Sequence, residues 1–445
     1  FGSRDGRGPA GRAASAAMDD YKVVRRIAEG RFGTVFEATR LSSGQRVAIK
    51  KVRARRPPPG WTEDPWSKSA QREIEVLGSV SHEHVVPLLD HYVTGETTTL
   101  LVYEYLAWDL AALLEQLAPL AEDQIKTLLQ MLFRGLSHLH LQSVMHRDLK
   151  PANLLLDGSS GVLRIADFGS ARFSPGPAAD PREANRTSLE GGPAEEDRGD
   201  PGGLLTREVC TRWYKSPEML FGAVDYTRSV DLWAAGCVVS ELLSPGGKAL
   251  FPGNSDLEQL CLIFQTRGTP CKEEWPEVCR LPDFCKVEFK AREPQPFEFE
   301  EVRSAAAVGL ARGLLQLTPQ RRMPVADALE HEFFRVDPPP LEPHHLVNGL
   351  DRPTVIRGQV EPVSGSDVSP LIECDHGSDE SCLGLPQADF EPVEIETTTC
   401  GLWDDVALSA AAGREDEAGA PPREPSGSRT PPPPSDGAHR FKMRG

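Results

Sequence analysis

Short apolar runs separated by polar turns fill the first part of the chain. Between residues 21 and 105 the runs "YKVVRRIAEG", "TVFEATR", "RVAIKKVRA" and "TLLVYEYL" are rich in Val, Ile and Tyr and are bounded by Gly or polar residues, which is typical of β-strands. One stretch differs, because "KSAQREIEVLGSV" places Ala70, Ile74 and Leu77 at helical spacing. The pattern predicts a β-rich unit with one helix.

The pattern turns helical after Asp109. Apolar residues then recur at helical spacing in "LAALLEQL", "DQIKTLLQMLFRGLSHLH", "SVDLWAAGCVVSELL", "DLEQLCLIFQTRG" and "AAAVGLARGLLQL". A β-rich part at 21–105 followed by a helical part at 109–334 predicts an α+β fold of two lobes. We expect a small β-rich N-lobe, a larger, mainly α-helical C-lobe, and a cleft between them.

Three segments lack this periodicity. Residues 1–17 are small and contain Arg, residues 174–205 are rich in Pro, Gly and Glu, and residues 335–445 are acidic and Pro-rich. Such compositions cannot bury enough apolar surface to fold. We therefore expect a folded domain at 18–334 with an unstructured insertion at 174–205. Residues 1–17 are expected to be a disordered extension, and 335–445 a disordered tail.

Charge and cysteine usage argue against several classes of protein. The net charge is −17, none of the nine Cys forms a CxxC pair, and no apolar run reaches the length of a membrane span. A partner that is nucleic acid or an anionic membrane is therefore not expected. The cysteines are expected to be reduced intracellular thiols.

Candidate phosphate-binding residues occur in the β-rich part. "IAEGRFGTVFEA" places Gly30 and Gly33 in a turn between two strands, where a missing side chain lets backbone N–H groups approach phosphates. Lys50 in "VAIKK" is a candidate phosphate-binding cation, and Glu73 in the following helix could pair with it and fix its direction. Each signal alone is weak, since a hairpin glycine or a strand-end lysine is more often ordinary surface.

The stretch "HRDLKPANLLL" carries a sharper signal. Asp148, Lys150 and Asn153 fall within six residues after a long helical pattern. A carboxylate, a cation and a neutral oxygen ligand can together orient a hydroxyl, neutralise a phosphoryl group and hold a divalent ion. "IADFGSAR" adds the carboxylate of Asp167. Oxygen ligands such as Asn153 and Asp167 suit Mg²⁺.

The order of these elements resembles the signature set of the protein kinases over roughly residues 21–334. The resemblance implies a bilobal protein-kinase fold, with Glu73 on its αC helix, and the use of ATP and Mg²⁺. It implies that Asp148 is the catalytic base and that Lys150 stabilises the transferred phosphoryl group. It also implies that Lys50, braced by Glu73, contacts the ATP phosphates.

The same resemblance implies a nucleotide pocket. "LVYEYL" is similar to the kinase hinge, whose backbone at Glu104 and Leu106 would bond adenine, with Tyr103 at the back of the pocket. Asn153 and Asp167 would hold magnesium. The residues implied to contact the nucleotide and its metal are Ile27, Ala28, Glu29, Gly30, Gly33, Val35, Ala48, Lys50, Tyr103, Glu104, Leu106, Asp109, Asn153, Leu155 and Asp167.

Three stretches resemble the cyclin-dependent kinases in particular. They are the αC motif "SAQREIEVL", the activation-loop end "TRWYKSPE" and the insert "LFPGNSDLEQLCLIFQTRGTPCKEEWPEV". Lys150, two residues after Asp148, resembles serine/threonine kinases, and the phrases "KPANLLL", "DLEQLC" and "EEWPEVCRLPDFCKVEFK" resemble the cell-cycle-related branch. The resemblance implies action on protein substrates at Ser or Thr followed by Pro. It further implies a cell-cycle or ciliary role, a location in cytoplasm, nucleus or cilium, and a cyclin or other activating subunit as a candidate partner.

Thr206 stands where this family carries its activating phosphothreonine, which implies an upstream activating kinase. Arg72, Arg147 and Arg172 occupy the matching positions of an arginine cluster. Such a cluster repels itself when empty and can close around a phosphate through charge-assisted hydrogen bonds. We therefore interpret Thr206 as a switch.

The chain also departs from the family pattern. Arg31 and Phe32 occupy the glycine-loop positions at which many cyclin-dependent kinases carry inhibitory Thr and Tyr phosphosites, so that control should be absent. Gln71 replaces an apolar residue that helps to dock cyclin. Lys215 and Ser216 stand where the family usually has Arg and Ala, which leaves the preference for Pro unsecured.

A second function class remains open from the sequence. A pseudokinase could act as a scaffold through its fold and its acidic tail. The catalytic positions discriminate the two, and all five are retained: Lys50, Glu73, Asp148, Asn153 and Asp167. Ala28, in place of the usual first glycine, is the one departure among the nucleotide-binding residues. An active kinase is the favoured interpretation.

Overall fold

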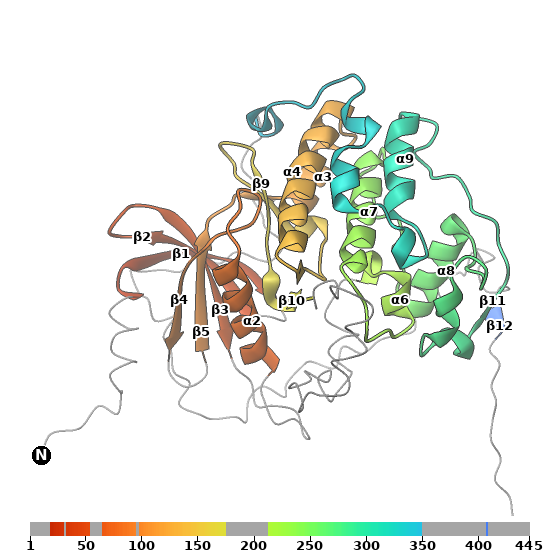
Figure 1. The fold of residues 1–445 in the computed structure, drawn as a ribbon. Helices are drawn as coiled ribbons and strands as arrows, with labels where there is room; N and C mark the ends of the chain where they lie inside the picture. Colours follow the sequence, from red (N-terminus) through yellow and green to blue (C-terminus); the bar gives the residue numbers. More distant parts are fainter. Residues whose placement is uncertain are drawn as a thin grey trace, which may run out of the picture.

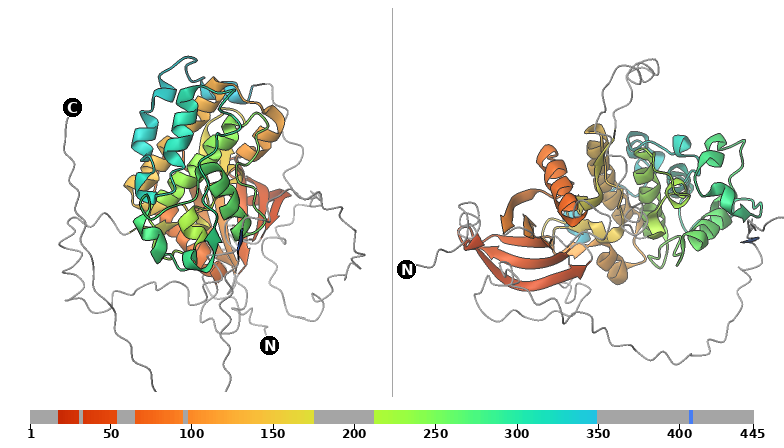
Figure 2. Two further views of the ribbon diagram at one scale, coloured as in Figure 1. Left: turned by 90° about the vertical axis from the view of Figure 1, so that its right-hand side faces the viewer. Right: turned by 90° about the horizontal axis from the view of Figure 1, so that it is seen from below.

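The protein folds into a β-rich lobe and a helical lobe. The structure is a computed structural model and describes residues 18–30, 33–53, 65–94, 98–174, 212–348 and 406–407. Figure 1 shows the β-sheet on one side of the molecule and the helices α4, α7, α8 and α9 on the other, and the views in Figure 2 agree. The predicted α+β fold of two lobes is confirmed.

Five antiparallel strands form the sheet of the N-lobe, in the order β1-β2-β3-β5-β4. Side chains alternate across it: in β3, Val47 and Ile49 are buried in a small outer core, whereas Ala48 and Lys50 face the other lobe. The strands are β1 (Tyr21–Gly30), β2 (Gly33–Arg40), β3 (Arg46–Arg53), β4 (Leu88–Thr94) and β5 (Thr98–Glu104).

One helix, α2 (Pro65–Ser79), packs against this sheet and contacts β3, β4 and β5. Of the apolar residues at the predicted helical spacing, Ala70 and Leu77 are buried and Ile74 is partly buried. The same helix contacts the 3-10 turn η2 (Phe168–Ser170) of the C-lobe. Helix α2 therefore touches both lobes next to the cleft.

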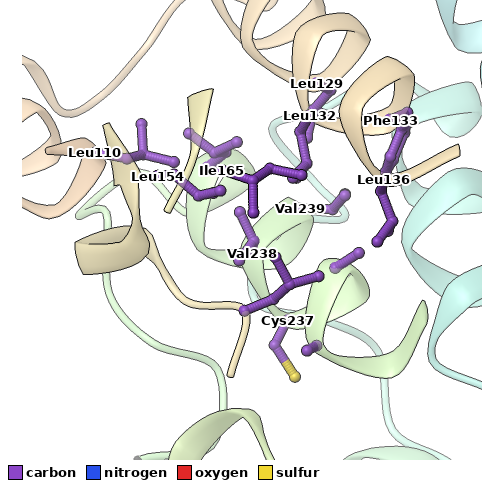
Figure 3. Packing of buried hydrophobic residues seen from close by; sticks show 14 of the residues in the cluster. Leu110, Leu129, Leu132, Phe133, Leu136, Leu154, Ile165, Cys237, Val238 and Val239 are labelled. Carbon is purple, nitrogen blue, oxygen red and sulfur yellow. The ribbon is translucent and has the colours of Figure 1, made fainter. Parts of the chain in front are cut away.

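The C-lobe is built around α4 and α7. Every residue of α7 is buried, which explains why its sequence is apolar on all sides. In Figure 3 the side chains of Leu132 and Leu136 from α4, Val238 and Val239 from α7, and Ile165 form part of one cluster. The helices are α3 (Leu110–Leu117), α4 (Glu122–Leu141), α6 (Pro217–Leu220), α7 (Ser229–Leu243), α8 (Asp256–Arg267), α9 (Ala305–Leu314) and α10 (Val325–Leu329).

Very short paired strands hold the ends of the loops near the cleft in place. Strands β6, β8 and β9 form one small sheet, and β7 pairs with β10, so the chain before and after each loop is held in place. The strands are β6 (Trp108–Asp109), β7 (Val144–Met145), β8 (Leu154–Leu156), β9 (Leu163–Ile165), β10 (Arg172–Phe173), β11 (Glu288–Phe289) and β12 (Val406–Ala407). The 3-10 turns besides η2 are η1 (Pro151–Asn153), η3 (Arg212–Tyr214), η4 (Pro276–Arg280), η5 (Phe284–Lys286), η6 (Pro319–Arg321), η7 (Glu332–Phe334) and η8 (Pro343–Leu346).

The predicted boundary of the folded domain at residue 334 needs correction. The Lys126 ammonium donates hydrogen bonds to the carbonyl oxygens of Val336 and Pro338, both at 2.7 Å, and Leu346 is buried. The packed chain therefore continues to residue 348, because α4 offers it polar partners and an apolar surface. Strand β12, inside the predicted tail, pairs with β11.

The other segments predicted to be disordered, 1–17, 175–205 and the rest of the tail, lie outside the described residues. Among the helices that the structure describes, none combines the length and the apolar character needed to cross a membrane.

Candidate active site

A cleft of about 450 Å³ separates the lobes. Apolar side chains such as Val35 and Ala48 line it from the sheet, and Leu155 lines it from the C-lobe. The cleft gathers the residues predicted to contact a nucleotide, apart from Gly30. Gly30 ends β1, next to residues 31–32, which lie outside the described ranges. Those lining the cleft are Ile27, Ala28, Glu29, Gly33, Val35, Ala48, Lys50, Tyr103, Glu104, Leu106, Asp109, Asn153, Leu155 and Asp167.

Gly33 begins β2 at the roof of the cleft, and its backbone requires glycine. Its φ of 129° lies outside the range of ordinary side chains, and an added Cβ would fall 2.1 Å from the Lys51 carbonyl oxygen. The glycine thus lets β2 approach β3 closely. Gly33 is therefore needed for the packing of β2 against β3 as well as for the predicted approach of phosphates.

Lys50 forms the centre of a buried ionic cluster. Its ammonium lies 2.8 Å from Oε2 of Glu73 on α2 and 2.9 Å from Oδ1 of Asp167 before η2. Burial alone would raise the pKa of Asp167, but the charge and hydrogen bond of Lys50 outweigh it and bring this pKa to about 2. The three predicted residues meet, and the carboxylate of Asp167 is ionised at neutral pH.

Asp148 and Lys150 lie together in the catalytic loop. The Lys150 ammonium donates to Oδ2 of Asp148 at 2.7 Å. The amide nitrogen of Asn153 donates to the Asp148 carbonyl oxygen at 2.8 Å. Burial raises the pKa of Asp148, Lys150 opposes this rise, and the negative charge of Asp167 adds to it. A carboxylate with a raised pKa next to a cation is suited to accept a proton from a hydroxyl.

Asp231, which no sequence motif indicated, supports this loop. The Asp231 carboxylate, at the start of α7, accepts hydrogen bonds from the backbone N–H groups of His146 and Arg147 at 2.9 and 2.8 Å. Arg147 has a φ of 68°, an uncommon left-handed conformation that these bonds help to hold. The available signal was an acid inside the otherwise apolar run "SVDLWAAGCVV".

The donor set fits a magnesium ion bound together with phosphates. The Asn153 amide nitrogen is occupied, so its carbonyl oxygen is the atom left to act as a ligand, and Asp167 supplies a carboxylate. Within the described ranges, no cluster of three His, Cys, Asp or Glu side chains could hold a metal alone. Mg²⁺ fits this case, because it commonly binds one or two protein oxygens and completes its shell with phosphate and water.

The structure adds other residues to the predicted pocket. Asp109 lines the cleft but also caps α3, since its Oδ1 accepts a hydrogen bond from the Ala112 N–H at 2.8 Å. The side chain of Glu104 pairs with Arg164 at 3.2 Å. The lining residues that the sequence did not indicate are Val86, Tyr105, Ala107, Trp108, Ala111, Ala112, Glu115, Ala152 and Ala166.

Comparison with known proteins agrees with this geometry. Residues 21–334 match the family model described as "Protein kinase domain". The chain belongs to the protein kinase family. Cyclin-dependent kinase 20 of Mus musculus is 40% identical over 334 residues, which cover 74% of this chain and 87% of the mouse protein. The human cyclin-dependent kinase 20 is 39% identical over 333 residues, with the same coverage.

Cyclin-dependent kinase D-1 of Arabidopsis thaliana is 34% identical over 329 residues, 74% of each chain. The kinase described here is therefore a cyclin-dependent-kinase-like serine/threonine kinase. Its family uses ATP as substrate and Mg²⁺ as cofactor, in agreement with the donor set in the cleft. Protein substrates follow from the family.

Proposed function

We propose that this kinase transfers the ATP γ-phosphate to Ser or Thr followed by Pro, and that phosphorylation of Thr206 activates it. The observation that carries the transfer chemistry is that Lys50, Asn153 and Asp167 line one cleft. Asp148 lies beside them, since Asn153 bonds it and the charge of Asp167 raises its pKa. The preference for Pro and the role of Thr206 rest on the sequence resemblance. The described parts of the activation segment support both.

Each polar residue of the cleft has a distinct proposed role. Asp148 orients the substrate hydroxyl and accepts its proton. Lys150, 2.7 Å from that carboxylate, places a positive charge next to the transferred group. Lys50, fixed by Glu73, holds the nucleotide phosphates. Bound magnesium, held by Asn153 and Asp167, would supply neutralisation of phosphate charge.

The three arginines proposed to bind phosphorylated Thr206 come from adjacent elements. Arg72 lies on α2, which contacts β10, and β10 carries Arg172. Arg172 pairs with Met145 in β7, two residues before Arg147. Arg147 donates to the Ser170 carbonyl oxygen at 2.6 Å and to the Tyr226 hydroxyl at 2.7 Å. Thr206 itself lies outside the described residues.

Thr206 can be tested by substitution. We expect Thr206→Ala to lower kcat/KM by about tenfold or more, because charge-assisted hydrogen bonds contribute roughly 1.5–3 kcal/mol each. Thr206→Ser keeps the acceptor hydroxyl and should keep activity after treatment with an activating kinase. Full activity of Thr206→Ala would refute the switch.

The segment that would present the substrate is anchored on the C-lobe. Trp213 donates from its indole nitrogen to the Gly253 carbonyl oxygen at 3.1 Å, and Arg212 pairs with Asp256 at 2.7 Å. Lys215 and Ser216 are both buried. We expect peptides with Ser-Pro to be phosphorylated faster than the same peptides with Ser-Ala, as measured by initial rates. Equal rates would remove the preference for Pro.

For the cellular role we propose participation in the cell cycle or at the cilium, in cytoplasm and nucleus. The support is the similarity to proteins called cyclin-dependent kinases. Gln71 is exposed on α2 at the position that helps to dock cyclin in the family. A polar residue there weakens an apolar contact, which argues against dependence on a cyclin.

A further inference from the structure

Both oxygens of the Glu73 carboxylate have a donor from the sheet. Oε2 accepts from Lys50, and Oε1 accepts from the hydroxyl of Tyr103 at 2.6 Å. The side chain of Glu73 is only 2% exposed, and Tyr103 is 8% exposed. Without the Tyr103 hydroxyl, Oε1 would be a buried acceptor that has lost this donor, which is strongly unfavourable.

The Tyr103 hydroxyl is held at a fixed position. Tyr103 lies in β5, where it pairs with Ala48 in β3 and with Leu88 in β4, so it is in the interior of the sheet. Burial and the charge of Glu73 raise the pKa of Tyr103, which keeps the hydroxyl protonated as a donor. Lys50 and Tyr103 thus bind one carboxylate of α2 from neighbouring strands.

A second hydroxyl ties the same helix to the other lobe. Ser69 lies one helical turn before Glu73, on the same face of α2. Its Oγ donates to the carbonyl oxygen of Gly169 in η2 at 3.0 Å. The approach is close, since a Cβ on Gly169 would fall 2.5 Å from this Oγ. Gly169 follows Asp167 by two residues, so α2 is joined to the segment that carries the predicted magnesium ligand.

We propose that Tyr103 and Ser69 are positioning residues that hold α2 in its catalytic placement from within the chain. The pair between Lys50 and Glu73 then forms without an activating subunit. Tyr103 acts through Glu73, and Ser69 acts through the backbone of η2. Figure 1 shows α2 between the sheet and β10, and the helix contacts both. The effect of this placement on catalysis rests on the proposed kinase function. The placement of α2 itself can be measured without kinase activity.

Hydrogen exchange of α2 tests the proposal without relying on activity. The full-length chain alone, without nucleotide, is compared with Tyr103→Phe and Ser69→Ala by mass spectrometry of peptides covering residues 68–79. We expect the α2 amides to be protected in the wild type. Exchange should become about tenfold faster in Tyr103→Phe, with a smaller increase in Ser69→Ala.

Two matched control variants each lose a hydroxyl that does not bond Glu73 or Gly169. Tyr92→Phe removes a hydroxyl that bonds Asp90 in the same sheet, and Ser79→Ala removes one that bonds the Val76 carbonyl oxygen in the last turn of α2. Both should leave exchange at residues 68–77 unchanged. An unprotected α2 in the wild-type chain, or the same exchange in Tyr103→Phe as in wild type, would overturn the proposal.

A double-mutant cycle separates positioning from general stability. In a Glu73→Met background, the acceptor of the Tyr103 hydroxyl is gone, so Tyr103→Phe should cause little further exchange in α2. An effect of Tyr103→Phe that is fully retained in Glu73→Met would show that the hydroxyl does not act through Glu73. Rates of peptide phosphorylation should follow the same order, with kcat/KM for ATP falling about tenfold in Tyr103→Phe.

Discussion

Asp148 lies where ionisation of its carboxylate is opposed by its surroundings. Burial raises its pKa, and the nearby charge of Lys150 only partly offsets this. Because the folded pKa exceeds the unfolded one, the associated stability is present at low pH and is lost as the pH rises through the folded pKa. At neutral pH the ionised carboxylate therefore lowers the free energy of unfolding, and a function that needs the charge explains why the residue is there.

Substitution of Asp148 by Asn should separate stability from catalysis. We expect Asp148→Asn to reduce kcat by about 10²–10⁴-fold, the usual range for a general base. Its free energy of unfolding at pH 7 should equal or exceed that of the wild type, and this advantage should shrink as the pH falls toward 4. Urea unfolding at several pH values measures it. A variant that is both active and less stable would contradict the role assigned to Asp148.

At the scale of elements, a buried ion pair fixes α6 to the chain that follows η6. Both terminal nitrogens of Arg322 bond the carboxylate of Glu218, at 2.6 and 2.7 Å. The side chains are 0% and 5% exposed, and Arg322 also donates to the Ser229 carbonyl oxygen at the start of α7. The activation segment thus ends on a helix that is joined to the core of the C-lobe.

Removal of one partner of this pair should be costly. We expect Arg322→Met to lower the free energy of unfolding by about 3–5 kcal/mol, because it leaves the Glu218 carboxylate buried without its partner. The control is Arg335→Ala, whose pair with Glu330 is 67% and 77% exposed and should contribute less than about 1 kcal/mol. Similar losses in the two variants, measured by urea unfolding, would contradict this difference.

The long elements follow from the sequence, whereas the short ones do not. The strands of the N-lobe and the helices α4 and α7 have enough residues for their apolar periodicity to be read. Strands such as β7 and β10 have two residues each, so they exist only because distant partners, Arg172 and Met145, meet. No local pattern could have predicted them. The chain from 335 to 348 was missed for the same reason, since its partners lie on α4.

At the scale of the whole molecule, motifs identified the reacting groups but not their support. Lys50, Asp148 and Asp167 could be recognised because their spacing along the chain is distinctive. The hydrogen bond from Tyr103 to Glu73 and those from the catalytic loop to Asp231 join residues 30 to 85 positions apart. Those contacts depend on how the two lobes and α7 pack, which a local motif does not encode.

The segment from 335 to 348 is expected to contribute to the stability of the domain. Substitution of Lys126 tests this. We expect Lys126→Met to lower the free energy of unfolding by about 1.5–3 kcal/mol, because the buried ammonium donates to two carbonyl oxygens of the segment. The control is Lys286→Met, whose side chain is 68% exposed in its pair with Asp283 and should change stability by less than about 1 kcal/mol. A change in Lys126→Met no larger than in the control would show that the segment adds no stability.

An assay of the transfer of radiolabelled phosphate from ATP to a Ser/Thr peptide tests directly whether this protein is a kinase that uses Asp148. The wild-type chain, treated with an activating kinase, is compared with Asp148→Asn in the presence and absence of Mg²⁺. We predict transfer that requires Mg²⁺ and falls to about 1% or less in Asp148→Asn. Nucleotide binding without transfer by the wild type, or transfer that survives in Asp148→Asn, would contradict catalysis in this cleft and favour a scaffold.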